Sequence, residues 1–210
     1  MGKRIISFDL TGTLATTRFC DSIYFQGLPE IYASINNVEI EEAKRYLRVF
    51  YDEVGDRSPE WYDIKYWFER LSLGNGWMEL LREMSHNIEW YPESEQVLAE
   101  LNYEYDLILL TNACREFMEV ETEAISKYFK RMISCVSEFG EVKKTPEFYL
   151  RVCQSLSCGT EDIIHVGDHW HFDYVAPRGC GMTAFYLDRS GRDDGDFTIH
   201  QLSDLRTRMI

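Results

Sequence analysis

The sequence predicts an α/β fold, in which a parallel sheet is covered by helices on both faces and an all-helical domain is inserted. Two observations predict this class. After residue 90, short apolar runs alternate with helix-like segments, which is the pattern of a parallel sheet. The first apolar run is separated from the second by far more residues than a crossover connection needs, so a separate unit is expected between them.

Four short runs rich in Ile, Leu, Val and Phe are predicted to be buried strands, because they are brief and do not alternate with polar residues. They occupy residues 5–8, 107–110, 163–166 and 183–187. Helix-like segments lie between the later runs, at residues 93–101, 116–129 and 146–156. Thr145 followed by Pro146 predicts the start of the last one, as an N-cap residue and a proline in the first turn.

The insertion shows helical periodicity with breakers between the periodic segments. One apolar face is formed by Ile40, Ala43, Leu47, Phe50 and Val54, and another by Trp61, Ile64, Phe68 and Leu71. Pro59 and the segment 74–76, with two glycines, interrupt the pattern. We therefore expect a catalytic core at residues 1–14 and 91–210 and a helical domain at residues 15–90.

Charge and cysteine content narrow the class of partner. The 36 acidic residues against 22 basic ones give a net charge of -14, which argues against nucleic acid and acidic membrane surfaces as partners. No apolar run is long enough to cross a bilayer. The six cysteines show no CxxC spacing, so reduced thiols and a cytoplasmic location are expected.

Polar residues follow three of the predicted strands, where open α/β sheets bind their ligands. They are Asp9 and Thr11 after the first strand, Thr111 and Asn112 after the second, and Asp168 and Asp173 after the third, with Lys143 between the last two strands. Acidic side chains, a hydroxyl and an ammonium group brought together at one edge can hold a divalent cation and a phosphoryl group.

Each residue type has a chemical reason to be in such a site. A carboxylate such as Asp9 can attack phosphorus and form an aspartyl phosphate, which divides one difficult displacement into two easier ones. Magnesium held by oxygen ligands removes the repulsion between the two anions and aligns them. A lysine and a hydroxyl then stabilise the charge on the phosphoryl oxygens. Gly12 allows the tight turn after the strand.

The order of these residues resembles the four motifs of the haloacid dehalogenase superfamily over nearly the whole chain, and the insertion resembles its helical type-1 cap domain. The resemblance implies a Rossmann-like core in which Asp9 is the nucleophile and Thr111 and Lys143 bind phosphate. It also implies Mg²⁺ on Asp9, Asp168 and the backbone carbonyl of Thr11, with Asp173 at the metal site orienting a bound water or Lys143. Asn112 is a further candidate for substrate binding. Lys144 competes with Lys143, but the spacing to Pro146 in the family's Lys-Pro-x-Pro pattern favours Lys143.

The sequence departs from the family's phosphatases at Thr11, where they carry a general acid-base aspartate. Losing such a group typically costs about 10²- to 10⁴-fold in rate. Either the substrate has a good leaving group, such as an acyl phosphate, or the cap supplies an acid, for which Asp21 and Glu30 are candidates, or turnover is slow. His169 and His171 are a second departure, and we expect them to pack at the sheet edge or face solvent rather than bind a metal.

The predicted function is a magnesium-dependent phosphohydrolase that acts on a small phosphorylated metabolite through an aspartyl phosphate on Asp9. A haloacid-type dehalogenase is one alternative, and a weakly catalytic domain that binds a phosphorylated ligand is another, because Thr11 replaces the usual acid. The aromatic residues of the insertion, among them Tyr24, Trp61 and Tyr62, either line a pocket for an apolar leaving group or simply pack the helices together. Lys65 is expected on a helix exterior rather than as a Schiff-base lysine.

Overall fold

The computed structural model describes residues 4–143 and 145–209, and it contains a parallel sheet with the strand order β3-β2-β1-β4-β5-β6. The strands are β1 (Ile5–Phe8), β2 (Asp106–Thr111), β3 (Arg131–Ser134), β4 (Ile163–Gly167), β5 (Thr183–Leu187) and β6 (Thr198–Ile199). The four predicted strands are therefore confirmed, and β3 and β6 are additions at the two edges of the sheet.

The register of the three central strands brings their carboxyl ends to one level. Phe8 of β1 pairs with Leu109 of β2 on one side and with Val166 of β4 on the other. The backbone N–H of Asp9 donates to the carbonyl of Val166 at 2.9 Å, which continues the ladder for one more residue. Polar residues that follow these three strands consequently meet at the carboxyl ends of the strands, as parallel sheets require.

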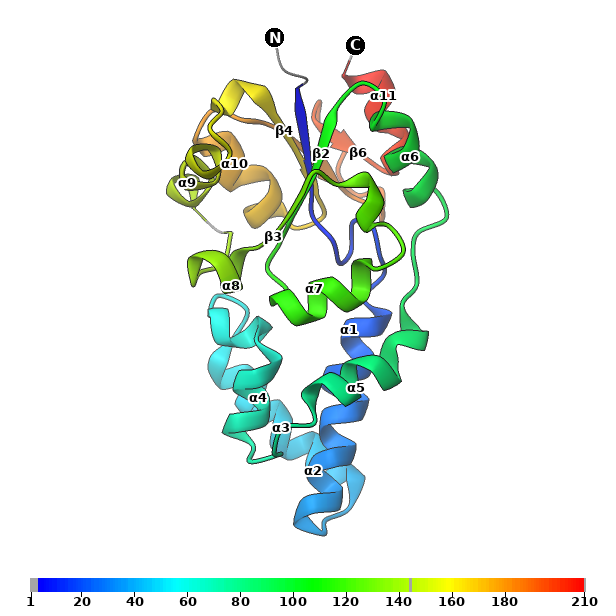
Figure 1. Ribbon diagram of the computed structural model, residues 1–210, viewed down its shortest axis with the longest axis vertical. Helices are drawn as coiled ribbons and strands as arrows, with labels where there is room; N and C mark the ends of the chain where they lie inside the picture. The colour runs from blue at the N-terminus through cyan, green and yellow to red at the C-terminus, as the bar shows by residue number, and fades with distance from the viewer. Residues whose placement is uncertain (1–3, 144, 210) are drawn as a thin grey trace.

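Helices cover both faces of the sheet (Figure 1). One face packs against α6 (Ser94–Leu101), α7 (Arg115–Thr122) and α11 (Leu205–Arg208), and the other packs against α8 (Cys135–Phe139), α9 (Pro146–Leu156) and α10 (Ala176–Gly179). The predicted α/β class is thus confirmed. Thr145 caps α9 as predicted, because its side chain accepts from the backbone N–H of Phe148 at 3.2 Å.

The helix predicted at residues 116–129 is wrong in length. Helix α7 ends at Thr122, and the chain then forms a turn and a short 3₁₀ segment, Ser126–Tyr128. The turn places the buried side chain of Ile125 in the same apolar cluster as Met118 of α7. The chain therefore adopts the turn that buries Ile125 against the sheet instead of continuing the helix.

The inserted cap domain is built from helices, and its apolar cluster also includes Cys114 and Phe117 of the core. Its helices are α1 (Arg18–Ser22), α2 (Leu28–Asn36), α3 (Ile40–Val54), α4 (Ile64–Arg70) and α5 (Trp77–Met84), with a π-helical segment at Ile23–Gly27 and a 3₁₀ segment at Pro59–Tyr62. The chain leaves and re-enters the core at adjacent points, because Ala15 and Trp90 form an isolated β-bridge. In Figure 1 the cap lies below the sheet.

Cap and core touch through α7, which lies between the sheet and the cap (Figure 1). The rings of Phe19 and Phe117 are 4.9 Å apart, and Lys65 of the cap forms an ion pair with Glu116. Lys65 is thus engaged at the domain junction, and its Nζ also lies 5.2 Å from the Trp77 ring centroid. Within the described part of the chain, no helix has the length and apolar character that spanning a bilayer demands.

Candidate active site

The loop that follows β1 places Asp9 at the carboxyl edge of the sheet and then turns sharply at Gly12. Gly12 has a φ of 89°, a conformation that residues with a Cβ rarely adopt. A Cβ on Gly12 would lie 2.2 Å from Oδ2 of Asp168. The glycine therefore serves both the turn and the close approach of the Asp168 carboxylate to the loop after β1.

Replacing Gly12 with alanine is expected to lower kcat/KM by about 10²-fold or more, because the new methyl group displaces the Asp168 carboxylate. Gly74→Ala is the matched control, since Gly74 has a φ of 79° and an added Cβ would meet nothing within 4 Å. Both variants carry the backbone strain, of roughly 1–3 kcal/mol, but only the first carries the collision. Steady-state kinetics and urea unfolding of the two variants check this, and equal losses of activity would contradict it.

Lys143 lies at the centre of the site and is almost fully buried. Its ammonium group forms an ion pair with Asp9 and a second one with Oδ1 of Asp173 at 2.6 Å. Burial alone would lower its pKa, but the charges of Asp173 and Asp9 reverse this, and the pKa is raised. Lys143 is therefore held as a cation beside Asp9. Its competitor in the sequence, Lys144, lies outside the described residues.

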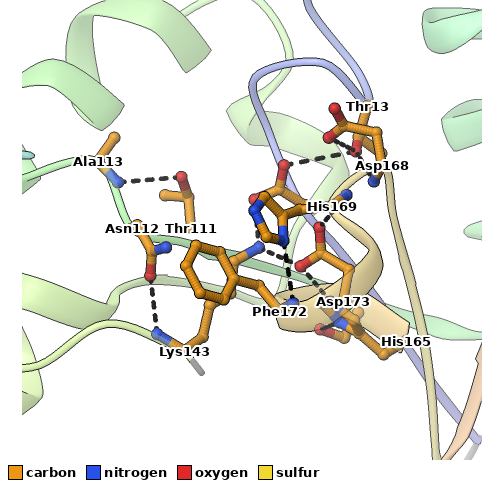
Figure 2. A network of polar contacts seen from close by, with 12 residues as sticks. Thr13, Thr111, Asn112, Ala113, Lys143, His165, Asp168, His169, Phe172 and Asp173 are labelled. Atoms are coloured by element: carbon orange, nitrogen blue, oxygen red, sulfur yellow. Dashed lines mark hydrogen bonds and ion pairs between the residues drawn. The ribbon is translucent and has the colours of Figure 1, made fainter. Parts of the chain in front are cut away.

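Asp173 is fixed from three sides, as Figure 2 shows. Besides Lys143, its Oδ1 is 3.1 Å from Nε2 of His165, and its Oδ2 accepts from the backbone N–H of His169 at 2.9 Å. Burial opposes ionisation of Asp173, yet Lys143 and His165 hold its pKa well below the usual range. The carboxylate thus orients Lys143, which is one of the two roles that the resemblance implied for it.

His165 lies in β4 and was not singled out from the sequence, since it interrupts an apolar run. It is fully buried, and its Nδ1 is 2.8 Å from Oγ of Ser7 in β1. Burial lowers its pKa more than Asp173 raises it, so the ring is neutral. A neutral ring that donates from Nε2 to Asp173 accepts at Nδ1 from the Ser7 hydroxyl. The Ser7 hydroxyl is therefore linked to Lys143 through His165 and Asp173.

Carboxylate oxygens of Asp9, Asp168 and Asp173 lie within 4.8 Å of one another. Burial first, and then the charges of Asp9 and Asp173, raise the pKa of Asp168 to about 7. Such crowding of buried acids is relieved by a cation, and oxygen donors are the ligands that magnesium prefers. The donor set fits Mg²⁺, with Asp9 and Asp168 as the available carboxylates, because Asp173 already has three partners.

Two hydroxyls and one amide complete the polar part of the site. Thr13 Oγ1 is 3.1 Å from Oδ1 of Asp168 and fixes that carboxylate. Thr111 accepts from the backbone N–H of Ala113 at 3.2 Å, which leaves its hydroxyl proton to donate elsewhere. Asn112 accepts from the backbone N–H of Lys143 at 2.9 Å, so it positions the loop that carries the lysine. Thr11 lines the same cavity.

A buried glutamate that the sequence analysis did not identify lies close to Thr11, in the loop after β1. Glu121 of α7 is 1% exposed, and among the described residues neither of its carboxylate oxygens makes a hydrogen bond. Burial and the charge of Asp9 raise its pKa to about 8, although the nearby Thr11 side chain lowers it slightly. The cap acids Asp21 and Glu30 are both exposed and do not line the cavity above Asp9.

The two histidines of the last motif differ in their surroundings. His169 lines the cavity, its ring stacks on Phe172 with centroids 3.9 Å apart, and its Nδ1 accepts from the Phe172 backbone N–H at 3.1 Å. His171 is exposed. Among the described residues, the acidic group that could hold a metal includes neither ring.

Comparison with known proteins identifies the family of this arrangement. The model of the haloacid dehalogenase-like hydrolases matches residues 3–181, which is most of the chain. The chain belongs to this family. Its fold is accordingly the Rossmann-like α/β fold with an inserted cap, and it is a hydrolase.

Solved structures of the family share the fold. A phosphatase from Thermococcus onnurineus superposes with a TM-score of 0.86 and 22% identity, over 98% of this chain and 97% of its own. A 2-haloacid dehalogenase from Pseudomonas syringae pv. Tomato gives 0.71 and 21%, over 100% and 98%. The hydrolase YfnB from Bacillus subtilis, described as bound to magnesium, gives 0.70 and 15%, over the full length of both chains.

Among curated proteins, the chain is similar to the GMP/IMP nucleotidase YrfG of Escherichia coli. The two are 36% identical over 69 residues. That segment covers 32% of this chain and only 30% of the nucleotidase. The similarity is therefore local.

Proposed function

We propose that this haloacid dehalogenase-like hydrolase is a magnesium-dependent phosphohydrolase that forms an aspartyl phosphate on Asp9 and acts on a small phosphorylated metabolite. The observation that carries the proposal is the convergence of a buried, charged Lys143 with the carboxylates of Asp9 and Asp168 at one edge of the sheet. A carboxylate between a cation and a metal-binding acid is suited to attack phosphorus.

The residues of this chain take separate parts in the reaction. Asp9 attacks the phosphorus atom, and the ammonium group of Lys143 binds the phosphoryl oxygens in place of part of its present contact with Asp9. The Thr111 hydroxyl, whose proton has no acceptor among the described residues, donates to the same group. Asn112 and Asp173 hold Lys143 in position by its backbone N–H and its ammonium group.

Magnesium would be held by Asp9, Asp168 and the backbone carbonyl of Thr11, and when bound it neutralises charge between nucleophile and phosphate. Thr13 prepares Asp168 for this role by fixing its Oδ1 at 3.1 Å. YfnB, which shares the fold, is described as bound to magnesium, and this supports a role for the ion in the proposal. The role of Asp173 in this proposal is to orient Lys143 rather than to bind the ion directly.

A dehalogenase is the alternative function, because some proteins with a similar fold, such as the Pseudomonas enzyme, are dehalogenases. Its substrate carries a carboxylate, which calls for a second cation near the attacked carbon. Among the described residues that line the cavity, Lys143 is the single lysine or arginine, and it is already paired with Asp9 and Asp173. The partly buried acid Asp168 also suits a metal, so the phosphatase is favoured.

The six cysteines are all free thiols within the described structure. Free thiols persist in reducing compartments. This observation supports the further proposal of a cytoplasmic location. We also propose that a small phosphorylated metabolite is the substrate and that neither nucleic acid nor membrane is a partner.

Release of inorganic phosphate from a panel of small phosphate esters and acyl phosphates tests the proposed function. We expect release in the presence of Mg²⁺ and a loss of at least about 10²-fold when a chelator removes the ion, because buried carboxylates then face the phosphate unshielded. Restored activity on adding back Mg²⁺ is the control against irreversible damage. Halide release from 2-haloacids that is insensitive to the chelator would instead support the dehalogenase.

A further inference from the structure

The geometry points to an aryl monophosphate, the phosphate ester of a phenol with a single ring and no further charge, as the substrate class of this site. The inference rests on the proposed phosphohydrolase function and deepens it. Three features carry it: the aromatic lining and size of the cavity above Asp9, the scarcity of free polar groups in that cavity, and the threonine at position 11.

The cavity above Asp9 is enclosed by aromatic side chains from both domains. Tyr24, Trp61 and Tyr62 come from the cap, and Phe117 and Phe172 come from the core. The Tyr24 ring lies within 2° of parallel to Trp61 at 6.1 Å and within 17° of parallel to Phe117 at 6.3 Å. Flat surfaces of this kind bind a flat apolar group better than a hydrated one.

The size of the cavity limits the leaving group to about one ring. Its volume is about 220 Å³. An apolar cavity of about 150 Å³ holds a benzene molecule, so this one takes a single ring with its phosphate directed at Asp9. A purine nucleotide, with a ribose and a two-ring base beyond the phosphate, is larger than this cavity, so part of it would lie outside the aromatic wall.

The two tyrosine hydroxyls of the aromatic wall are used within the protein. The Tyr24 hydroxyl donates to the carbonyl of Trp61 at 3.0 Å, and the Tyr62 hydroxyl donates to the carbonyl of Asp56 at 3.0 Å. A sugar would lose hydration here and find few partners for its hydroxyl groups. A second anionic group on the substrate would likewise find no cation beyond Lys143 among the described lining residues.

The chemistry at position 11 favours a leaving group that departs without a proton. Attack by an Asp9 oxygen forms the new P–O bond, and the bond from phosphorus to the ring oxygen breaks with its electron pair left on that oxygen. A phenolate, with a conjugate-acid pKa of about 10, tolerates this charge far better than an alkoxide, whose conjugate acid is comparable to water at about 15.7. Water then hydrolyses the aspartyl phosphate to hydrogen phosphate, and the proton released is taken up by the phenolate.

The wild-type protein tests the inference with four compounds: phenyl, benzyl, cyclohexyl and acetyl phosphate, each with Mg²⁺. Without a general acid, kcat/KM for phenyl phosphate is expected to exceed that for benzyl and cyclohexyl phosphate by about 10²-fold or more. Benzyl phosphate keeps the ring, so its KM should stay near that of phenyl phosphate while its kcat falls. Acetyl phosphate has a good leaving group but no ring, so its KM should be higher.

The outcomes separate the substrate class from the function. Phosphate release from acetyl phosphate with phenyl phosphate no better than cyclohexyl phosphate would overturn the aryl class and leave the phosphohydrolase standing. Absence of release from all four compounds would overturn the phosphohydrolase itself.

A variant pair tests the aromatic wall independently. Trp61→Leu removes a ring that stacks on Tyr24, and Tyr46→Leu removes a half-exposed cap ring that is outside the cavity. The ratio of kcat/KM for phenyl phosphate to that for acetyl phosphate is expected to fall about tenfold in Trp61→Leu and to be unchanged in Tyr46→Leu. An unchanged ratio in a folded Trp61→Leu protein, checked by circular dichroism, would contradict the proposed wall.

Discussion

Replacing Asp9 with asparagine is expected to lower kcat by at least about 10⁴-fold, because the amide has the same shape but is not a nucleophile toward phosphorus. The variant should remain folded. Asp9 lies near the acids Asp168, Asp173 and Glu121, and removing its charge relieves repulsion that raises the pKa of Asp168 and Glu121. Lys143 retains its ion pair with Asp173. Initial rates of phosphate release and the unfolding midpoint check the two expectations.

Asp106→Asn is the matched control for this substitution. Asp106 is the first residue of β2 and pairs in register with Ile5. It therefore lies at the amino ends of the strands, whereas Asp9 lies at their carboxyl ends. The control should keep its activity within about twofold, as surface substitutions far from a site usually do. Turnover by Asp9→Asn at a substantial fraction of the wild-type rate would rule out the aspartyl-phosphate route.

Replacing Glu121 with glutamine is expected to change how the stability of the protein depends on pH. The pKa of Glu121 is raised from 4.5 to about 8 by burial and by Asp9. Between these two pH values the folded protein binds one more proton at this group than the unfolded chain does. The free energy of unfolding therefore falls by about 1.4 kcal/mol per pH unit as the pH rises, or roughly 3–5 kcal/mol in total. The glutamine variant lacks this contribution.

Urea unfolding in the presence of a chelator, at about pH 5 and about pH 9, measures the difference. The variant should be more stable than wild type at the higher pH by roughly 2–4 kcal/mol and nearly equal to it at the lower pH. Glu119→Gln, an exposed glutamate of the same helix, is the control and should follow the wild-type curve. Parallel curves for Glu121→Gln and wild type would show that Glu121 is ionised in the folded protein.

The fold could be predicted where its strands are buried on both faces. The four central strands are predominantly apolar, with Ser7 and His165 as polar residues inside β1 and β4, because helices cover both sides of the sheet. The edge strands β3 and β6 escaped prediction for physical reasons. Arg131 and Met132 of β3 are only partly buried, and β6 has two residues, so neither strand needs a long apolar run.

The candidate site could be predicted in so far as its residues end strands. Asp9, Thr111 and Asp168 follow buried runs, and parallel register then brings them together. Glu121 was missed because a glutamate in a short amphipathic helix is typical of a surface position. It is buried because α7 packs against the loop that follows β1. His165 was missed because one polar residue in a strand indicates neither its depth nor its partners.

The hydroxyl of Ser7 and the ring of His165 connect the interior of the sheet to the carboxylate of Asp9 through Asp173 and Lys143. Mutational tolerance should consequently be uneven within this core. Swapping one aliphatic side chain for another at Ile6 or Val166 alters volume alone, whereas an apolar residue at either of the two linked positions also leaves its partner unsatisfied and Asp173 less constrained. Libraries designed to raise thermal stability by repacking the core should keep Ser7 and His165 unchanged, even though both side chains are buried.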